Sequence, residues 1–425
     1  MHQTHRLLAA CCLSILAQHA AAASASDDAA LDLVPATTGA AKKPDSRSFR
    51  VFGELAAGRM SLRYGLPAED TRRASLDFSW EFKASPQWRA VVSDRLDDVH
   101  PVNSGSRSTL NSLREAYVGW QDEAGRFAVD LGRVNVRYGP GYGFNPTDYF
   151  RDGASRAVTT ADPLALRENR LGTAMLRLQR LWNGGSVSLT VAPKLKDGPS
   201  NESFSTDLGS TNHAGRVLLA VGMQPTDKVS LQAFVFHERH KGAHLGANAT
   251  ALVSDAVVGF AEWSAGRDHD LLSAAVGPVA QVVTGHRATV GVTYTTPSKL
   301  ALTTEIEYNG FALTRAQWDQ AVSTYGLEPL GTYLYGVQQR QDIASRKALL
   351  VYASQRDAGI RNLELTGLLR YNMEDRSRFA WAEARYHWPR FDLALQWQVN
   401  LGRAESEYGA QTGKRLVQLL GAFYF

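Results

Sequence analysis

The sequence predicts an all-β fold, a transmembrane antiparallel up-and-down β-barrel of about 18 strands, within a range of about 16 to 20. Three observations predict it. Apolar and polar residues alternate with a period of two in many segments, short and long connections alternate between these segments, and the chain ends on the aromatic residues Phe423-Tyr424-Phe425. Lipid-facing and lumen-facing side chains alternate along a membrane-spanning strand, so this period is typical of such a barrel.

The first 25 residues have the pattern of a secretory signal peptide. A basic start, His5-Arg6, precedes an apolar run from Leu7 to Leu16 and the small-residue triplet Ala23-Ser24-Ala25. The apolar run is too short to cross a bilayer as a helix. We therefore expect residues 1–25 to be removed from the mature chain.

Residues 26–48 are rich in Ala, Asp, Thr and Lys and show neither the helical nor the strand period. This composition predicts a disordered periplasmic leader, with the barrel following over residues 49–425. The mean hydropathy of -0.25 and the 21% of charged residues are compatible with a membrane barrel, because the hydropathy values of lipid-facing and lumen-facing residues cancel in the mean.

The alternation is clearest in two segments. In residues 75–83 the apolar set is Leu76, Phe78, Trp80 and Phe82, and polar residues stand between its members. Residues 391–401 show the same pattern over a longer stretch. Four further segments alternate in the same way: 229–235, 288–294, 300–309 and 363–371.

Turn-forming residues divide the chain into hairpins. Short connections are expected near residues 84–87, 121–125, 181–185, 224–227, 265–268, 296–298, 355–360 and 387–389. Longer ones are expected near residues 58–72, 96–108, 139–169, 196–211, 241–250, 310–344 and 403–413, and two tight outer ones near 282–284 and 374–376. Membrane barrels have short periplasmic turns and longer outer loops, so both termini are expected in the periplasm.

The sequence of residues 314–325 predicts a short helix within the longest of the expected outer loops. Trp318 and Val322 are four residues apart and would share one face of it. Such a helix would either fold into the mouth of the barrel or lie on its rim.

The last twelve residues form the closing strand. Val417, Leu419, Phe423 and Phe425 lie on one face of it, with Gly421 among them, and Lys414, Gln418 and Tyr424 lie on the other. This ending resembles the terminal signature strand of Gram-negative outer-membrane β-barrels, which the barrel-assembly machinery recognises. The resemblance implies an outer-membrane location and that machinery as a partner, through the strand that ends in Phe425.

A second resemblance lies in residues 113–148. Its residues are Leu113-Arg114-Glu115-Ala116-Tyr117-Val118, Leu131-Gly132-Arg133, Tyr138-Gly139 and Asn145-Pro146-Thr147-Asp148. This segment is similar to a pattern of substrate-specific outer-membrane channels of the porin and alginate-exporter-like families. In that pattern Gln commonly follows the Gly-Arg pair, whereas Val134 stands here. The resemblance implies a barrel fold and a transport role, without a specific cargo.

The glycines around Pro140 predict an irregular path that lets the loop near residues 139–169 bend back into the bore. Charged residues bracket this loop: Arg137, Asp148, Arg151, Asp152, Arg156, Arg167, Glu168 and Arg170. In one interpretation they face each other across a constriction and sort solutes by charge. In the other they pair with each other and pin the loop to the wall.

Arginine dominates the basic residues, since 36 of the 46 are Arg and ten are Lys. The planar guanidinium binds carboxylate and phosphate well. Four arginines on polar-face positions are expected to line the lumen and to favour anionic solutes or an acidic polymer: Arg177, Arg287, Arg370 and Arg385. Arginines of outer loops would alternatively hold lipopolysaccharide phosphates, and a net charge of +4 does not decide between the two.

A cluster of His237, Glu238, His240 and His244 is the one candidate for a rim enzyme or a metal site. His240 and His244, four residues apart, could bind one metal ion only if the loop were helical, and Gly242 opposes a helix there. We interpret them as solvated loop residues. No enzyme activity, no metal, no cofactor and no nucleic-acid partner is expected.

Together these patterns predict a porin-like channel in the outer membrane of a Gram-negative bacterium. It would allow passive passage of small hydrophilic solutes, with a preference for anionic ones. Outer-membrane lipid and lipopolysaccharide would surround it. Two alternatives stay open: an export conduit for a polysaccharide or another polymer, working with a periplasmic partner, and a rim enzyme or structural barrel.

Overall fold

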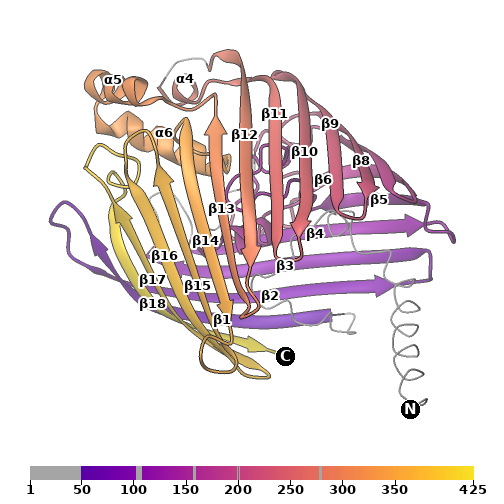
Figure 1. Ribbon diagram of the computed structural model, residues 1–425, viewed down its shortest axis with the longest axis horizontal. Coiled ribbons are helices and arrows are strands. Elements are labelled where there is room, and N and C mark those ends of the chain that lie inside the picture. The colour runs from indigo at the N-terminus through magenta and orange to yellow at the C-terminus, as the bar shows by residue number, and fades with distance from the viewer. Residues whose placement is uncertain (1–48, 102–107, 157–158, 199, 201, 277–279) are drawn as a thin grey trace, which may run out of the picture.

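The computed structural model describes residues 49–425 except 102–107, 157–158, 199, 201 and 277–279 (Figure 1). The expected signal peptide, residues 1–25, and the expected leader, residues 26–48, lie outside the described residues. Within the described part, eighteen strands form one antiparallel sheet in which consecutive strands pair. The expected fold class is confirmed.

The strands have these bounds: β1 Phe49–Leu62, β2 Glu69–Lys83, β3 Trp88–His100, β4 Thr109–Gln121, β5 Phe127–Val134, β6 Thr173–Trp182, β7 Gly185–Ala192, β8 Arg216–Thr226, β9 Val229–Glu238, β10 Gly242–Ser254, β11 Val257–His269, β12 Val282–Thr295, β13 Leu300–Asn309, β14 Lys347–Arg356, β15 Leu363–Asn372, β16 Arg378–His387, β17 Phe391–Leu401 and β18 Gly413–Tyr424. Most are long enough to cross a bilayer, for which about 9 to 11 tilted residues suffice.

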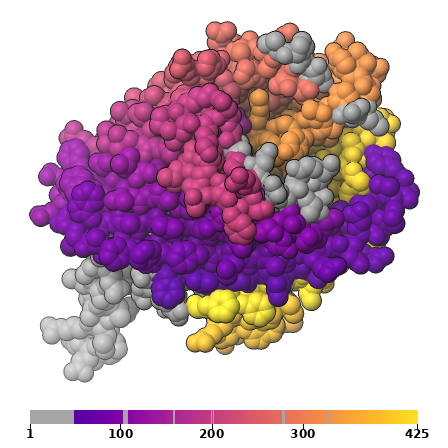
Figure 2. Space-filling view, turned by 180° about the vertical axis from the view of Figure 1, so that it is seen from behind, coloured from indigo at the N-terminus to yellow at the C-terminus, as the bar shows by residue number. Residues whose placement is uncertain are grey.

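The sheet closes because its first and last strands pair. Phe52 lies opposite Tyr424 and Met60 opposite Leu416, while β1 also pairs with β2. The N–H of Phe425 extends the ladder by donating to the Val51 carbonyl at 3.1 Å. Figure 2 shows the indigo N-terminal strands against the yellow C-terminal strands along this seam. Closure leaves no open sheet edge, which a bilayer would not tolerate.

The two faces of the sheet differ as the alternation predicts. On β2, Leu76 and Phe78 are 50% and 36% exposed on the outside, and Asp77 between them is fully buried on the inside. Many further inward side chains are polar and buried, among them Thr190, Glu305, Glu307 and Asn309. The apolar outer face and polar inner face are those of a membrane-spanning barrel.

Long and short connections separate the two ends of the barrel, which we name the loop end and the turn end. The turn end carries connections such as 84–87 and 296–299, and the loop end carries connections such as 135–172 and 310–346. The N-terminal end of β1 and the C-terminal end of β18 both lie at the turn end.

Three expected connections are wrong. Of the connection expected near residues 241–250, residues 242–250 lie in β10, and residues 265–268 lie in β11; the turn between these strands is at residues 255–256. The outer face of β10 consists largely of alanines, such as Ala243, Ala247 and Ala249, which alternate too weakly in hydropathy to reveal a strand. The next loop runs over residues 270–281, and the tight connection expected near 282–284 lies in β12.

In the described part of the chain, four short helices lie in the long connections: α3 Pro163–Glu168, α4 Leu271–Val276, α5 Arg315–Tyr325 and α6 Leu327–Gln339. The last three lie together at the loop end (Figure 1). Helix α5 confirms the helix expected over residues 314–325, with Thr314 and Gln317 forming a capping box. Trp318 is buried against Tyr333 of α6, which holds the two helices together. Among the described residues, no helix has the length and apolar character needed to cross a bilayer.

Candidate functional site

The connection between β5 and β6, residues 135–172, folds into the barrel and defines the candidate site. We name it the inserted loop. Its aromatic side chains Tyr138, Tyr142, Phe144 and Phe150 are each at most 4% exposed, although they belong to a connection and not to a strand. Each fully buried aromatic side chain contributes roughly 1.5–3 kcal/mol. The loop is therefore packed as firmly as a protein core.

An apolar patch on the inner wall of β8 and β9 receives one side of the inserted loop. Tyr138 and Phe150 pack into a cluster with Leu218, Phe234 and other buried residues. Tyr149 stacks on Phe236 with ring centroids 4.5 Å apart. This patch explains why the barrel interior is not uniformly polar.

Two carboxylates on the inner wall hold the other side of the loop. Glu262 of β11 accepts from the Gly141 N–H at 2.7 Å and from the Thr147 hydroxyl at 2.9 Å. Glu305 of β13 accepts from the N–H groups of Tyr142 and Gly143. The loop thus presents its backbone donors to buried acceptors, which stabilises both.

Gly139 and Gly143 allow this close approach of loop and wall. Gly139 has a φ of +94°, and a Cβ on it would collide with the Glu262 carboxylate. A Cβ on Gly143 would collide with Glu307 and Arg370. The glycine-rich path predicted around Pro140 is therefore required by contact with the far wall.

Arg370 of β15 completes this anchor. Its guanidinium donates to the Gly143 carbonyl at 2.6 Å and to Glu307 Oε1 at 3.1 Å. The wall thus binds the backbone of the inserted loop through both its donors and its acceptors. The position of Arg370 in the lumen agrees with the sequence-based expectation. Glu262 and Glu305 were not expected as anchors, because their partners lie more than a hundred residues away in the chain.

Within the inserted loop, the buried charges pair. Arg170 and Asp148 form a bidentate pair with distances of 2.7 and 3.1 Å. Arg167 donates to the carbonyls of Tyr138 and Gly139 at 3.0 and 3.2 Å. These contacts correspond to the interpretation in which the charges pin the loop.

Arg151 and Asp152 connect the inserted loop to the loop end. Arg151 lies 3.3 Å from Asp342, which follows α6, and Asp152 lies 3.3 Å from Lys241. Arg287 of β12 joins the same network at 3.0 Å from Asp342. Burial alone would raise the pKa of Asp152, but Lys241 and other cations hold that pKa below its usual value.

Two further sequence-predicted arginines have different surroundings. Arg156 donates to backbone carbonyls of Asn111, Ser200 and Glu202, at distances of 2.5 to 3.1 Å. Arg177 of β6 is 3% exposed on the inner wall. Neither lies in the anchor of the inserted loop, and the structure does not bring them together.

Charged side chains that keep solvent contact lie around α3. Arg137 and Glu168 are 4.0 Å apart, with 34% and 68% of their side chains exposed. Asp162 caps α3 by accepting from the Leu164 N–H. Burial, together with Glu383 and Glu168, raises the pKa of Asp162 to about 6. Leu164 of α3 packs against a buried cluster that contains Trp381 of β16, so α3 faces that part of the wall.

A charge network that no local sequence pattern predicts lines β1 to β4. Arg95 lies 2.5 Å from Glu54 and 3.0 Å from Asp97, and Arg114 binds Asp77 at 2.7 Å. On the wall of β16, Arg385 pairs with Glu383 at 2.7 Å. The inner wall thus carries alternating charges of both signs, most of them paired.

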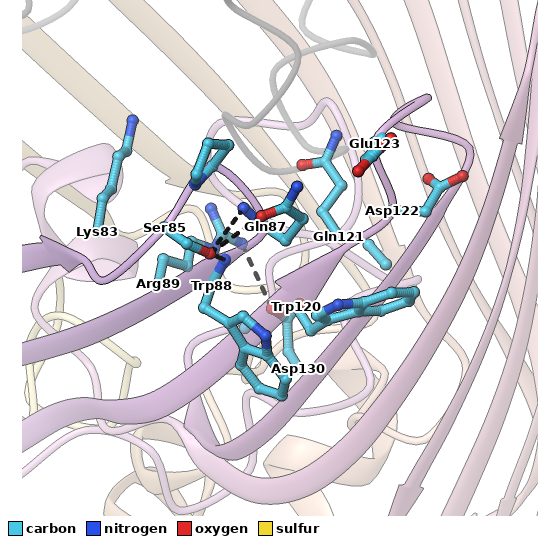
Figure 3. Close-up of a pocket in the computed structure, with 13 residues that line it drawn as sticks. Lys83, Ser85, Gln87, Trp88, Arg89, Trp120, Gln121, Asp122, Glu123 and Asp130 are labelled. Atoms are coloured by element: carbon cyan, nitrogen blue, oxygen red, sulfur yellow. Dashed lines mark hydrogen bonds and ion pairs between the residues drawn. The ribbon is translucent and has the colours of Figure 1, made fainter.

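At the turn end, a polar pocket of about 430 Å³ lies between the β2–β3 and β4–β5 turns (Figure 3). Arg89 lies 3.3 Å from Asp130, and Trp88 and Trp120 form part of the lining. Ser85 orders the first turn by accepting from the N–H groups of Gln87 and Trp88. The pocket holds side chains of both signs in no arrangement that indicates catalysis.

The histidine cluster separates in the structure. His244 lies in β10 and is 5% exposed, next to the rings of Tyr149 and Phe236, so it is not the solvated loop residue that we expected. Glu238 faces inward and pairs with Arg216 at 3.0 Å. Among the described residues, no group of three or more His, Cys, Asp or Glu side chains is placed to hold a metal ion.

Comparison with known proteins identifies the fold. No family model and no curated protein matches the sequence. The structure is similar to OccAB1 of Acinetobacter baumannii, with a TM-score of 0.56 and 10% identity over 89% of this chain and 96% of that one. It is also similar to OccAB3 of the same organism (TM-score 0.56, 8% identity, 89% and 98% covered) and to OccK5 (OpdH) of Pseudomonas aeruginosa (0.54, 8%, 89% and 97%). The chain has the fold of Gram-negative outer-membrane porins, which confirms the resemblance at the level of the fold.

Proposed function

We propose that this protein is a porin-like channel of a Gram-negative outer membrane, through which small hydrophilic solutes pass passively. One observation carries the proposal: a closed barrel of eighteen strands, apolar outside and polar inside, contains a loop folded into its bore. An eighteen-stranded barrel is wide enough to enclose an aqueous passage, whereas about eight strands would be filled by their own side chains.

The inserted loop favours small solutes over a polymer. It reaches from β5 to anchors on β11, β13 and β15, so it occupies part of the cross-section. Export of a polymer would require this loop to leave the bore, which its buried aromatic and ionic contacts oppose. We therefore favour the channel over the export conduit.

We propose that Arg137, Asp162, Glu168 and Arg385 border the narrow part of the passage. They surround α3 and the wall of β16, and Arg137 and Glu168 retain solvent contact. Arg287 and Arg370 form ion pairs with carboxylates, so each contributes less to anion preference than an unpaired arginine would. We expect weak anion selectivity that depends on ionic strength.

The other partners follow from the same location. We propose that the barrel-assembly machinery recognises β18 together with Phe425, and that outer-membrane lipid and lipopolysaccharide cover the apolar outer face. Deletion of Phe425 tests the first point, because it would lower the amount of heat-modifiable barrel in outer-membrane fractions. Equal amounts of both proteins would contradict it.

Planar-bilayer recording of the purified protein tests the channel directly. We expect discrete conductance steps and a permeability ratio moderately above one for chloride over potassium. The variants Arg137→Gln and Glu168→Gln should shift that ratio in opposite directions, since each removes one charge of opposite sign. A correctly folded barrel that carries no ionic current would overturn the proposal. Liposome swelling with small sugars and with oligosaccharides separates a channel for small solutes from an export conduit.

A further inference from the structure

Four arginines interrupt the apolar outer face near the loop end of the seam. We name Arg59 of β1, Arg72 of β2, Arg378 of β16 and Arg415 of β18 the outer arginine cluster. All four are exposed. They stand on the outward face, because each is an even number of residues from an outward apolar residue of its own strand: Arg59 from Leu55, Arg72 from Leu76, Arg378 from Ala382 and Arg415 from Val417.

The strand register brings these four side chains to one area. Arg59 lies opposite Asp70 and Val417, and Arg72 and Arg415 are each two residues from these positions. Such diagonal neighbours have Cα atoms about 7–8 Å apart, within reach of long side chains. Arg378 lies farther away, two strands from Arg415 across β17: Leu401, opposite Arg378, is two residues from Val399, which faces Arg415. In Figure 2 the strands of this area meet where indigo and yellow adjoin.

The cluster lies at one border of the apolar band. Arg415 precedes Phe423 by eight residues on the outward face of β18, and Arg378 precedes Tyr386 by eight on β16. The outward positions between these pairs are Val417, Leu419 and Gly421, and Ala380, Ala382 and Ala384. Because a tilted strand crosses the hydrocarbon core in about 9 to 11 residues, the arginines lie at the headgroup level of the leaflet on the loop side.

Three of the four arginines lack a protein counter-charge. Among the described residues, no carboxylate lies within ion-pairing distance of Arg72, Arg378 or Arg415. Arg59 lies 3.2 Å from Asp70, but both side chains are 69% exposed, so this pair is weak and open to exchange. Guanidinium groups at the headgroup level attract anions, and phosphate matches their planar donors.

We propose that the outer arginine cluster binds the phosphate groups of a phosphorylated glycolipid of the outer leaflet. The inference rests on the proposed outer-membrane location, and it adds a lipid site to the channel. Several guanidiniums in one area fit a headgroup with two phosphates better than a headgroup with one. The site lies on the outer wall, so its loss leaves the passage intact.

Binding of purified bisphosphorylated lipid A to the full-length protein tests the site. The variant Arg72→Gln/Arg378→Gln/Arg415→Gln should weaken binding about fivefold per arginine, and roughly 100-fold in total. The matched control is Arg239→Gln/Arg267→Gln/Lys347→Gln, which removes three exposed basic residues from the region of β9 to β14. This control should retain the affinity of the unmodified protein. Equal weakening in both variants would overturn the site, because binding would then follow net charge alone.

Two further measurements identify the source of the phosphate. Dephosphorylated lipid A should bind equally weakly to the unmodified protein and to the triple variant, and millimolar inorganic phosphate should not displace the bisphosphorylated form. Displacement by inorganic phosphate would overturn the lipid assignment in favour of a free-phosphate site.

Conductance of the triple variant separates the proposed lipid site from the proposed channel function. A conducting variant that has lost lipid A supports both, and a closed barrel that still shows cluster-dependent binding contradicts only the channel.

Discussion

Arg170 and Asp148 form a bidentate ion pair in the centre of the inserted loop, with Nη1 2.7 Å from Oδ2 and Nη2 3.1 Å from Oδ1. Both side chains are 1% exposed. Arg170 also donates to the Val136 carbonyl at 2.6 Å and to the Asn135 side chain at 2.9 Å. One guanidinium therefore joins the beginning, the middle and the end of the loop, so the shape of the constriction depends on it.

Replacement of Arg170 by alanine should loosen the inserted loop without dissolving the barrel. Breaking one side of a buried ion pair costs about 3–5 kcal/mol, whereas the strand ladder does not involve this pair. We expect larger and noisier single-channel currents. Arg170→Lys should recover only part of the effect, since lysine keeps the charge but lacks the fork.

The control for this variant is Arg137→Gln. Arg137 is partly exposed and lies 4.0 Å from Glu168, so its loss should change loop stability by less than about 1 kcal/mol. Current noise that rises equally in both variants would show that the bidentate pair does not stabilise the loop.

Replacement of Glu262 by glutamine should weaken the attachment of the glycine-rich part of the inserted loop to the barrel wall. One carboxylate oxygen accepts from Gly141 and Asn145 and the other from Thr147. Glutamine retains one acceptor and presents an amide to the remaining donors, which costs about 1–3 kcal/mol. Amide hydrogen exchange at Gly141 and Thr147 should become roughly 5- to 150-fold faster. Glu69→Gln, on the exposed rim of β2, serves as the control, and unchanged exchange in both variants would remove the anchoring role of Glu262.

Substitution of Gly139 by alanine should have a similar effect for a steric reason. Its φ of +94° disfavours a side chain, and the added Cβ would collide with Glu262. We expect a lower thermal stability of the loop and easier proteolysis within residues 135–172. Gly215→Ala is the matched control, since a Cβ at Gly215 meets no atom within 4 Å. Equal proteolysis of the two variants would contradict the close approach of loop and wall.

The alternation of apolar and polar residues, the turns and the closing strand could be predicted from the sequence, because each is a local property of neighbouring residues. The alternation around Leu76 and the aromatic end at Phe425 correspond directly to β2 and β18. The glycines near Pro140 revealed an irregular, inward path for the same reason. Strand β10 was missed because its outward alanines and inward Gly246 give hardly any contrast in hydropathy.

The partners across the bore could not be predicted in this way. Glu262 and Glu305 are ordinary polar-face residues in the alternation, and only the closed cylinder places them against Gly141 and Gly143. The charges of the loop were recognised, but whether they faced the passage or each other depended on distances that no local pattern contains. Most of them are paired, and Arg137 and Glu168 retain solvent contact.

Asp162 should make ion selectivity depend on pH. Burial together with Glu383 and Glu168 raises the pKa of Asp162 to about 6, above that of a free aspartate, so the protein favours its neutral form. As pH falls from 7.5 to 5, Asp162 loses its negative charge, and the anion-to-cation permeability ratio should rise with a midpoint near 6. Asp162→Asn keeps the cap on α3, removes this step and fixes the ratio near its low-pH value. The raised pKa also means that the stability contributed by the neutral form is lost as pH rises through about 6, so Asp162→Asn should be slightly more stable at pH 7.5. A selectivity step that persists in the variant would assign the titration to another group.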